Sequence, residues 1–349
     1  MERIQERDLS IDVLRCIGLI AIFIAHTFTS TMALQSVCFD VTLLMLLSGS
    51  SFALTTKKNN QIKWGQYFQR RFVRLVIPTW IFLAVYFSIC YILHKNVSIW
   101  HPIYSFTLCT EWYVWIIRVF LFIALLSPLI LSFDKRVKDN HVFMLLALLF
   151  FVMFDILTKN ALTVFPTFEF VNQHLSQYML YMLLICLPYV AVFAIGQRLF
   201  EMSKIQILEW AMLMLSMFFV MSLFLYDKEE RFIRSDDYKY PPHLYYVTFT
   251  LAISLLFWIC RYRITNALKI SGLVNVVVFV GQNTIWIYLW HVLILSMTKN
   301  GLSECVRFLA VLMGGVFLYY IQYLVINRVV LPHIHSADTK KNIKRIFCG

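Results

Sequence analysis

Residues 10–30 read SIDVLRCIGLIAIFIAHTFTS, an apolar run of about the length that crosses a membrane. A membrane-spanning helix needs about 20 predominantly apolar residues. Asp12, Arg15 and His26 interrupt this run. Ionisable side chains inside such a helix are costly and commonly mark a functional site. The stretch therefore predicts a helical membrane protein and indicates where its site lies.

The composition of the whole chain agrees with this reading. Of the 349 residues, 60% are hydrophobic and 14% are charged, and the mean hydropathy is +0.72. Soluble domains hold roughly 45–50% apolar and about 25% charged residues. Aromatic residues make up 17% of the chain, which excludes disordered, collagen-like and coiled-coil proteins. The composition indicates an integral membrane protein.

Ten apolar runs are long enough to span a bilayer. They cover residues 10–30, 34–55, 75–93, 112–131, 142–158, 176–197, 206–226, 244–260, 272–297 and 303–330. Continuous runs favour helices over the alternating pattern of a membrane β-barrel. We therefore predict an all-α bundle of about ten transmembrane helices that forms a single domain over residues 1–349.

The basic residues are distributed unequally between the two sides of these spans. Of 31 Lys and Arg residues, 20 fall in connections on the side of the N-terminus and 7 on the opposite side. Cytoplasmic connections carry the excess of Lys and Arg, so we predict that both termini are cytoplasmic. A basic loop, 56–74, and a short basic tail, 331–349, lie on that side. Because this charge follows one membrane face and forms no domain, nucleic acid is not an expected partner.

The loop contains the run KKNNQIKWGQYFQRRFVR at residues 57–74, which has two compatible interpretations. It can be an amphipathic helix that lies on anionic lipids and is held by Trp64, Tyr67 and Phe68. It can also be a cytosolic site for a polyphosphate. The eight cysteines are scattered without a CxxC pair, so neither a metal site nor a disulfide framework is expected.

Arg15 and His26 are eleven residues apart. In a helix this separation turns the chain by about 1100°, close to three full turns, and advances it by about 16 Å. The two side chains therefore share one face. Taken singly, Arg15 reads as an i,i+3 partner of Asp12 and His26 as a core histidine bonded to a carbonyl. Together, below an arginine-rich loop, they indicate a path for an elongated anionic ligand.

The second span contains LLMLLSGSSFAL at residues 43–54. Running from outside to inside, it places Asp40 at about the depth of His26 and the pair Ser48-Gly49 nearer that of Arg15. Small residues let helices or a ligand approach closely. Asp40 is expected either to orient the ring of His26 or to pair elsewhere.

Five motifs follow one another along the chain. They are Arg15 and His26 in an Arg-x10-His spacing with Asp12 before them, Ser48-Gly49 in LLMLLSGSSF, Arg71 and Arg74 in RRFVRLVIPTW, Trp112 in TEWYVWIIRVF, and Asn283 with His291 in GQNTIWIYLWHVLIL. In this order the set resembles the acyltransferase-3 family of integral-membrane acyltransferases over essentially the whole chain. One position departs from the family pattern, because Ser50 stands where the family usually has an aromatic residue.

The resemblance implies an O-acetyltransferase of the bacterial inner (plasma) membrane. Such an enzyme takes an acyl group, usually acetyl, from cytosolic acyl-CoA and transfers it to a hydroxyl of a cell-surface or exopolysaccharide sugar. Acetyl-CoA is then a co-substrate, and no bound cofactor or metal is expected. The expected partners are acyl-CoA, a glycan or lipid-linked sugar acceptor, and membrane lipids.

The resemblance also suggests roles for individual residues. Arg71 and Arg74 would bind the phosphates of coenzyme A, and its long arm would pass Arg15, Ser48 and Gly49 toward His26. His26 would act as general base, although a covalent acyl-histidine is equally consistent with the sequence.

The remaining candidates lie on the acceptor side or support the bundle. Glu111, Trp112 and Tyr113 cluster at the outer mouth of the fourth span, either as membrane-belt anchors or as a sugar-binding group. We expect Asn283 to support the site, and His291 to be a hydrogen-bond partner within the bundle, not a second base.

Two other functions are consistent with ten spans and buried charges. The first is a polytopic glycan transporter or flippase, although the chain shows no inverted repeat. The second is a membrane polysaccharide polymerase, which the charged outer loop 227–243 would suit.

Overall fold

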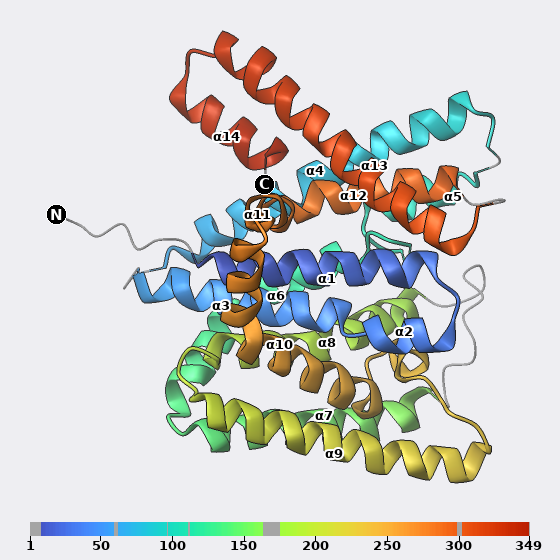
Figure 1. Cartoon of the computed structure of the whole chain (residues 1–349), viewed down its shortest axis with the longest axis vertical. Coiled ribbons are helices and arrows are strands. Elements are labelled where there is room, and N and C mark those ends of the chain that lie inside the picture. Colours follow the sequence, from blue (N-terminus) through green and yellow to red (C-terminus); the bar gives the residue numbers. More distant parts are fainter. Residues whose placement is uncertain are drawn as a thin grey trace. The chain divides into compact units, whose positions relative to one another are not determined.

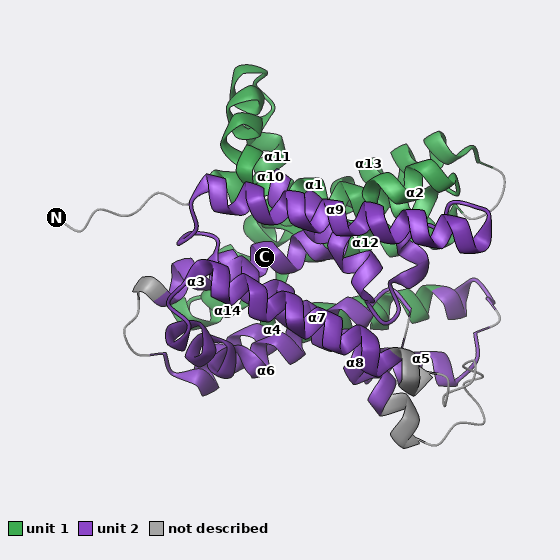
Figure 2. Ribbon diagram, turned by 90° about the horizontal axis from the view of Figure 1, so that it is seen from below, with its two compact units in different colours: residues 1–40, 73–89, 257–349 green, residues 41–72, 90–256 purple. Residues whose placement is uncertain are grey.

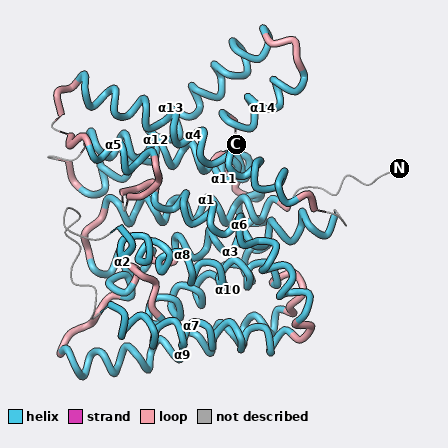
Figure 3. The backbone as a smooth tube through the Cα atoms, turned by 180° about the vertical axis from the view of Figure 1, so that it is seen from behind, coloured by secondary structure: helices cyan, strands magenta, loops and turns pink. Residues whose placement is uncertain are grey.

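The structure is a computed structural model that describes residues 8–58, 62–95, 97–110, 112–162, 175–298 and 302–348. All regular secondary structure in these residues is helical (Figure 3). The elements, labelled in Figure 1, are α1 (Leu9–Thr27), α2 (Thr31–Val37), α3 (Asp40–Lys58), α4 (Trp64–Ile92), α5 (Trp100–Phe106), α6 (Trp115–Arg136), α7 (Asn140–Leu162), α8 (Leu175–Arg198), α9 (Lys204–Glu229), η1 (Ser235–Tyr238), α10 (Leu244–Ile270), α11 (Val274–Gln282), α12 (Thr284–Met297), α13 (Glu304–Val325), η2 (Ile326–Val330), η3 (Leu331–His333) and α14 (Ala337–Phe347).

The helices confirm the predicted fold class. Within the described residues, nine helical segments are long and apolar enough to cross a membrane. The pair α11 and α12 passes the same test only when its two halves are taken together, and these halves are bent by 84°, as in a broken span or a re-entrant loop. The chain is thus an all-α, multi-pass membrane protein. The cytoplasmic location of its two termini stays a prediction.

The largest difference from the predicted spans is at α4. This helix begins at Trp64, eleven residues before the predicted start of the third span at residue 75. The second half of the basic loop is therefore the first part of a long helix. Its aromatic residues recur at helical spacing, and both Trp64 and Tyr67 contact the ring of Phe52, with ring centroids at 6.4 and 5.4 Å.

The chain divides into two compact units, which Figure 2 shows in different colours. Unit 1 comprises Met1–Asp40, Val73–Ile89 and Phe257–Gly349, and unit 2 comprises Val41–Phe72 and Cys90–Leu256. Each unit combines segments that are far apart in sequence. The single domain expected over residues 1–349 stays a prediction.

In unit 1, α1 packs against α11, α12 and α13. The contact with α11 is close, because a Cβ placed on Gly281 would lie 1.8 Å from the carbonyl oxygen of Asp12. Only glycine permits this approach. Helix α1 starts at Asp8, whose carboxylate accepts from the backbone N–H of Ser10 at 3.0 Å and so satisfies one of the unpaired donors of the first turn.

In unit 2, α3 and α8 are in contact through two glycines. A Cβ on Gly49 would lie 2.0 Å from the carbonyl oxygen of Phe193, and one on Gly196 would lie 2.0 Å from that of Leu46. Ser50 is fully buried, and its hydroxyl donates to the carbonyl of Gly196 at 2.9 Å. This close crossing is the small-residue packing expected between membrane helices. It leaves no room for an aromatic side chain at Ser50.

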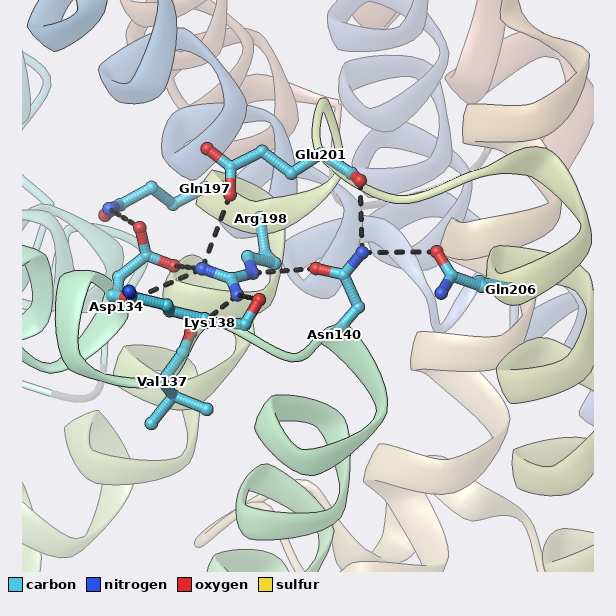
Figure 4. A network of polar contacts seen from close by, with 8 residues as sticks. All are labelled: Asp134, Val137, Lys138, Asn140, Gln197, Arg198, Glu201 and Gln206. Carbon is cyan, nitrogen blue, oxygen red and sulfur yellow. Dashed lines mark hydrogen bonds and ion pairs between the residues drawn. The ribbon is translucent and has the colours of Figure 1, made fainter.

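Arg198, the last residue of α8, joins the connections at one end of unit 2 (Figure 4). Its Nη1 donates to Asp134 Oδ1 at 3.0 Å, and its Nη2 donates to the carbonyls of Val137 and Lys138 at 2.6 Å each. Its Nε donates to Asn140 Oδ1 at 2.9 Å. The guanidinium is only 3% exposed, and a buried charge needs such partners. The network holds the chain between α6 and α7 against the end of α8.

Replacing Gly196 with Ala should destabilise unit 2, because the added methyl group overlaps the backbone of α3. Overpacking of this kind costs about 1–3 kcal/mol. We expect a lower midpoint for thermal unfolding of the purified protein in detergent. The matched control is Gly65→Ala in α4, where a Cβ meets nothing within 4 Å. Equal midpoints for the two variants would contradict the proposed crossing.

Candidate functional site

Two histidines from helices far apart in sequence meet in unit 1. His26 lies in the last turn of α1 and His291 lies in α12. Nδ1 of His26 is 3.0 Å from Nε2 of His291, and the two rings are nearly parallel, with centroids 5.2 Å apart. His291 is fully buried, and Phe23 stacks on it with ring centroids at 4.6 Å. His26 is half-buried.

The neighbours of His291 determine where the hydrogens of the neutral pair lie. Nδ1 of His291 contacts the carbonyl oxygen of Tyr288. A carbonyl oxygen only accepts, so this nitrogen carries the ring hydrogen and Nε2 carries the lone pair. Nδ1 of His26 must then donate to that lone pair. It follows that His26 carries its own lone pair on Nε2, the atom that a general base uses.

We expected His291 to be a hydrogen-bond partner within the bundle. In the structure its Nε2 lies within hydrogen-bond distance of His26. Asp40, the other candidate for orienting His26, is the first residue of α3 and is 2% exposed. Its pairing with His26 stays a prediction.

At the other end of α1, Arg15 and Asp12 form an i,i+3 ion pair. Nη1 of Arg15 is 2.8 Å from Oδ1 of Asp12, whose side chain is 1% exposed, whereas that of Arg15 is 24% exposed. Oδ2 of Asp12 accepts from Nε2 of Gln282 at 3.3 Å. The buried carboxylate thus orients the guanidinium and links α1 to α11.

Asn283 lies at the break between α11 and α12. Its Nδ2 donates to the carbonyl of Phe279 at 2.7 Å, which satisfies one of the carbonyls left unpaired at the end of a helix. Its Oδ1 accepts from the hydroxyl of Tyr319 at 2.6 Å. These bonds hold the bend of 84°, and the bend sets the direction of the helix that carries His291.

The donor-side candidates lie on α3 and α4. Arg71 and Arg74 are three residues apart on α4 and share one face of that helix. Both are half-buried, and the guanidinium of Arg71 lies 5.4 Å from the ring centroid of Tyr67. On α3, Ser48 is half-buried, and Gly49 packs against α8. The expected roles of Ser48 and Gly49 in binding acyl-CoA stay predictions.

The acceptor-side candidates precede α6. The rings of Trp112 and His101 meet edge-on, with centroids at 5.1 Å, and Trp112 also contacts Tyr113. Burial lowers the pKa of His101. Arg118 supports this segment, since its Nη1 donates to the carbonyl of Leu108 at 2.7 Å. Glu111 lies outside the described residues.

One buried polar pair in unit 2 was not predicted from the sequence. Oδ1 of Asp155, in α7, is 2.8 Å from Nδ1 of His243 and accepts from the backbone N–H of Leu244 at 3.2 Å. The two side chains are 88 residues apart in sequence, so no local spacing connects them. The only signal was an acid inside an apolar run.

The described part of the chain contains no group of three or more His, Cys, Asp or Glu residues that could hold a metal ion. Within unit 1, the candidate site offers the imidazole pair of His26 and His291 and the guanidinium of Arg15.

Replacing Tyr319 with Phe should destabilise unit 1, because it leaves the buried Oδ1 of Asn283 without its hydroxyl donor. A buried polar group deprived of its partner costs about 1–3 kcal/mol. The measurement is the thermal midpoint in detergent. Tyr320→Phe, on the same helix at a side chain that is 47% exposed, is the matched control and should change little. A Tyr319 variant as stable as this control would refute the role of the bond.

Comparison with known proteins assigns the chain to a family. Residues 8–326 match the acyltransferase-3 family, which is described as an acyltransferase domain. The comparisons with curated proteins and with solved structures found no match. The matched region contains every candidate site residue discussed above and covers nearly the whole chain. The chain therefore belongs to the acyltransferase-3 family and is a multi-pass membrane acyltransferase.

Proposed function

We propose that this acyltransferase transfers an acetyl group from cytosolic acetyl-CoA to a hydroxyl of a cell-surface or exopolysaccharide sugar, and that it does so in a bacterial inner membrane. The observation that carries the proposal is the bond between His26 and His291 at 3.0 Å. It provides a membrane-embedded imidazole whose tautomer is fixed by a buried neighbour. Family membership favours acyl transfer over the transport and polymerisation that the sequence left open.

His26 is the general base in this proposal. Its Nε2 takes the proton of the acceptor hydroxyl as the hydroxyl oxygen attacks the thioester carbon. When the tetrahedral intermediate collapses, the C–S bond breaks and the same proton passes to the leaving thiolate. The products are an ester and free coenzyme A. General-base catalysis of this kind contributes typically about 10²–10⁴-fold to the rate.

His291 acts as a positioning residue. Its Nε2 accepts from Nδ1 of His26, so it holds the ring in the tautomer that exposes a basic Nε2. The same bond stabilises the imidazolium that forms when His26 takes a proton. An acyl-histidine intermediate at Nε2 needs the same tautomer, so the geometry serves both routes.

The donor site is proposed at the basic face of α4. Coenzyme A carries several phosphate charges, and guanidinium groups bind phosphates through paired, charge-assisted hydrogen bonds. Arg71 and Arg74 share one helix face, and Tyr67 supports the guanidinium of Arg71. Arg15, oriented by Asp12, is proposed to contact the pantetheine arm. Ser48 and Gly49 are also proposed to contact it.

The acceptor site is proposed at the segment before α6. Aromatic faces that border polar groups suit sugar rings, which present apolar faces and hydroxyl edges. Trp112 and Tyr113 supply such faces here. Glu111 is proposed to bind hydroxyl groups.

Replacing His26 with Ala should abolish acyl transfer, because no group then accepts the hydroxyl proton. We expect a loss of at least about 10²-fold. The measurement is the O-acetyl signal in NMR spectra of the surface glycan from producing cells, at equal abundance of the protein in the membrane. His335→Ala, at an exposed position in the tail, serves as the control. A wild-type O-acetyl signal from the His26 variant would contradict the proposal.

Substitutions of His291 test positioning separately from packing. Gln retains an acceptor oxygen that can receive the hydrogen of His26 Nδ1, whereas Leu does not. We expect the Leu variant to lose about 10–100-fold in turnover, by analogy with the loss of other residues that orient a reactive histidine, with an unchanged Kd for acetyl-CoA. The Gln variant should recover most of the activity. Equal activity of both variants would contradict the positioning role.

Replacing Arg71 and Arg74 together with Gln should weaken acetyl-CoA binding. Each charge-assisted hydrogen bond contributes about 1.5–3 kcal/mol, so we expect the Kd to rise by at least about tenfold. Calorimetry on the purified protein measures this without an acceptor. The control is the double variant Lys135→Gln and Lys138→Gln, which removes the same charge from exposed positions elsewhere. An unchanged Kd in the arginine variant would indicate lipid anchoring instead.

A further inference from the structure

The C-terminal helix α14 is basic along one side and is attached to unit 1. Lys340, Lys341, Lys344 and Arg345 lie within its eleven residues. The helix begins after Ser336, whose hydroxyl accepts from the backbone N–H of Thr339 at 3.4 Å. An isolated helix of this length is marginal in water, so its order depends on the contacts described next.

Two side chains of the spanning helices hold the end of α14. Nε1 of Trp286 donates to the carbonyl of Ile346 at 2.7 Å, and Nε2 of Gln322 donates to that of Phe347 at 2.9 Å. Trp286 also stacks on Phe347, with ring centroids 5.9 Å apart. Oε1 of Gln322 in turn accepts from Trp290 at 2.9 Å. These bonds occupy the unpaired carbonyls at the helix end and fix α14 beside the last turns of α13 (Figure 1).

A hollow of about 530 Å³ lies between α14 and the end of the last spanning segment. It is lined by Asn327, Leu331 and Pro332 on one side and by Lys340, Lys341 and Lys344 on the other. The described residues that line it include no acidic side chain. Three lysines therefore line one space, and none of the described residues that line it carries a negative charge, which favours an anionic ligand.

The hollow lies at the end of the last helical segment that is long and apolar enough to span a membrane. This segment runs over Glu304–His333, so Leu331 and Pro332 belong to its final turn, and the ends of a spanning segment are where headgroups are expected. Basic pockets at the ends of membrane helices commonly bind lipid headgroups. At roughly 30 Å³ per water molecule, the volume holds far more than one small ion.

The use of lysine, and not arginine, favours a lipid phosphate over a rigidly recognised nucleotide. Lysine ammonium groups are point charges on flexible stems and make no fixed fork. Lys341 and Lys344 are exposed, and Lys340 is half-buried. Such groups suit a phosphodiester that changes its orientation as lipids exchange.

We propose that the hollow between α14 and the end of the last spanning segment, formed by η2 and η3, binds the phosphate of an anionic phospholipid. Lys340, Lys341 and Lys344 neutralise the headgroup, and Asn327 offers a neutral polar contact. The bonds from Trp286 and Gln322 keep these lysines in place. This site is independent of the proposed acetyl transfer, since none of its residues takes part in that proposal.

The test compares lipid binding to purified protein by native mass spectrometry. The probes are phosphatidylglycerol and phosphatidylcholine with the same acyl chains. Each basic residue near a membrane surface raises the affinity for anionic lipid by about fivefold. Replacing all three lysines with Gln should therefore weaken phosphatidylglycerol binding by at least about tenfold and leave phosphatidylcholine binding unchanged.

Two further variants separate a specific site from general electrostatics. The triple variant Lys135→Gln, Lys138→Gln and Lys204→Gln removes the same charge at exposed positions elsewhere and should keep wild-type affinity for phosphatidylglycerol. Replacing the three tail lysines with Arg should restore most of the affinity, which excludes misfolding as the cause. Equal losses in the two Gln triple variants, or no loss in the tail variant, would overturn the proposal.

Competition identifies the source of the phosphate. Free coenzyme A, added at concentrations that saturate the donor site, should not displace phosphatidylglycerol from the wild-type protein. Displacement that disappears in the tail variant would assign the hollow to a soluble nucleotide and would overturn the lipid assignment. The tail variant should also keep the wild-type Kd for acetyl-CoA, so failure here is distinguishable from failure of the proposed acetyl transfer.

Discussion

The need to satisfy polar groups away from water shapes unit 1. Helix α1 contacts the bent pair α11 and α12 at two points along its length. Near its start, the carbonyl of Asp12 lies against Gly281 and its carboxylate accepts from Gln282. Near its end, His26 donates to His291. The bend at Asn283 makes both contacts possible, because it lets α12 continue in a new direction from the point where α11 meets α1. The contact between His291 and the candidate base His26 thus depends on the side-chain amide of Asn283, which caps the end of α11.

Much of this arrangement was predictable because hydrophobicity and spacing are local properties. The apolar runs predicted the spanning helices, and the first run correctly put Arg15 and His26 on one helix. The i,i+3 pairing of Arg15 with Asp12 is also readable from spacing, and the structure confirms it. These features need only the geometry of a single helix.

The partners of buried groups could not be predicted in this way. His26 and His291 are 265 residues apart, and Asp155 and His243 are 88 residues apart. Which pairs form depends on which helices are neighbours, and that follows from packing that no single segment encodes. The break at Asn283 was hidden for a related reason, since residues 272–297 form a continuous apolar run. Its cause is a side chain that competes for backbone groups, supported by a tyrosine on another helix.

Ser50 shows how one position can serve packing where a family pattern would suggest a ligand contact. The residues around it bring α3 and α8 together so closely that glycine is required on both helices. A hydroxyl fits there because it donates to a carbonyl of the facing helix, whereas a ring would separate the helices. Gly49 is part of this crossing, so its small size has a structural reason whether or not a ligand passes beside it. Among the donor-side candidates, the arginines of α4 have no such packing role in the structure described above.

The chain's net charge of +12 need not have one purpose. Arg71 and Arg74 repeat at helical spacing, and Arg71 lies beside the ring of Tyr67. Guanidinium groups are rigid, planar donors suited to defined phosphate geometry. Lys340, Lys341 and Lys344 line one side of a hollow, and lysine ammonium groups are point charges on flexible stems. Both groups lie on the face that the excess of Lys and Arg predicts to be cytoplasmic, where soluble nucleotides and anionic lipids are both present. If the arginines bind the nucleotide substrate and the lysines bind the lipid, one membrane face would bind two kinds of phosphate compound at separate sites.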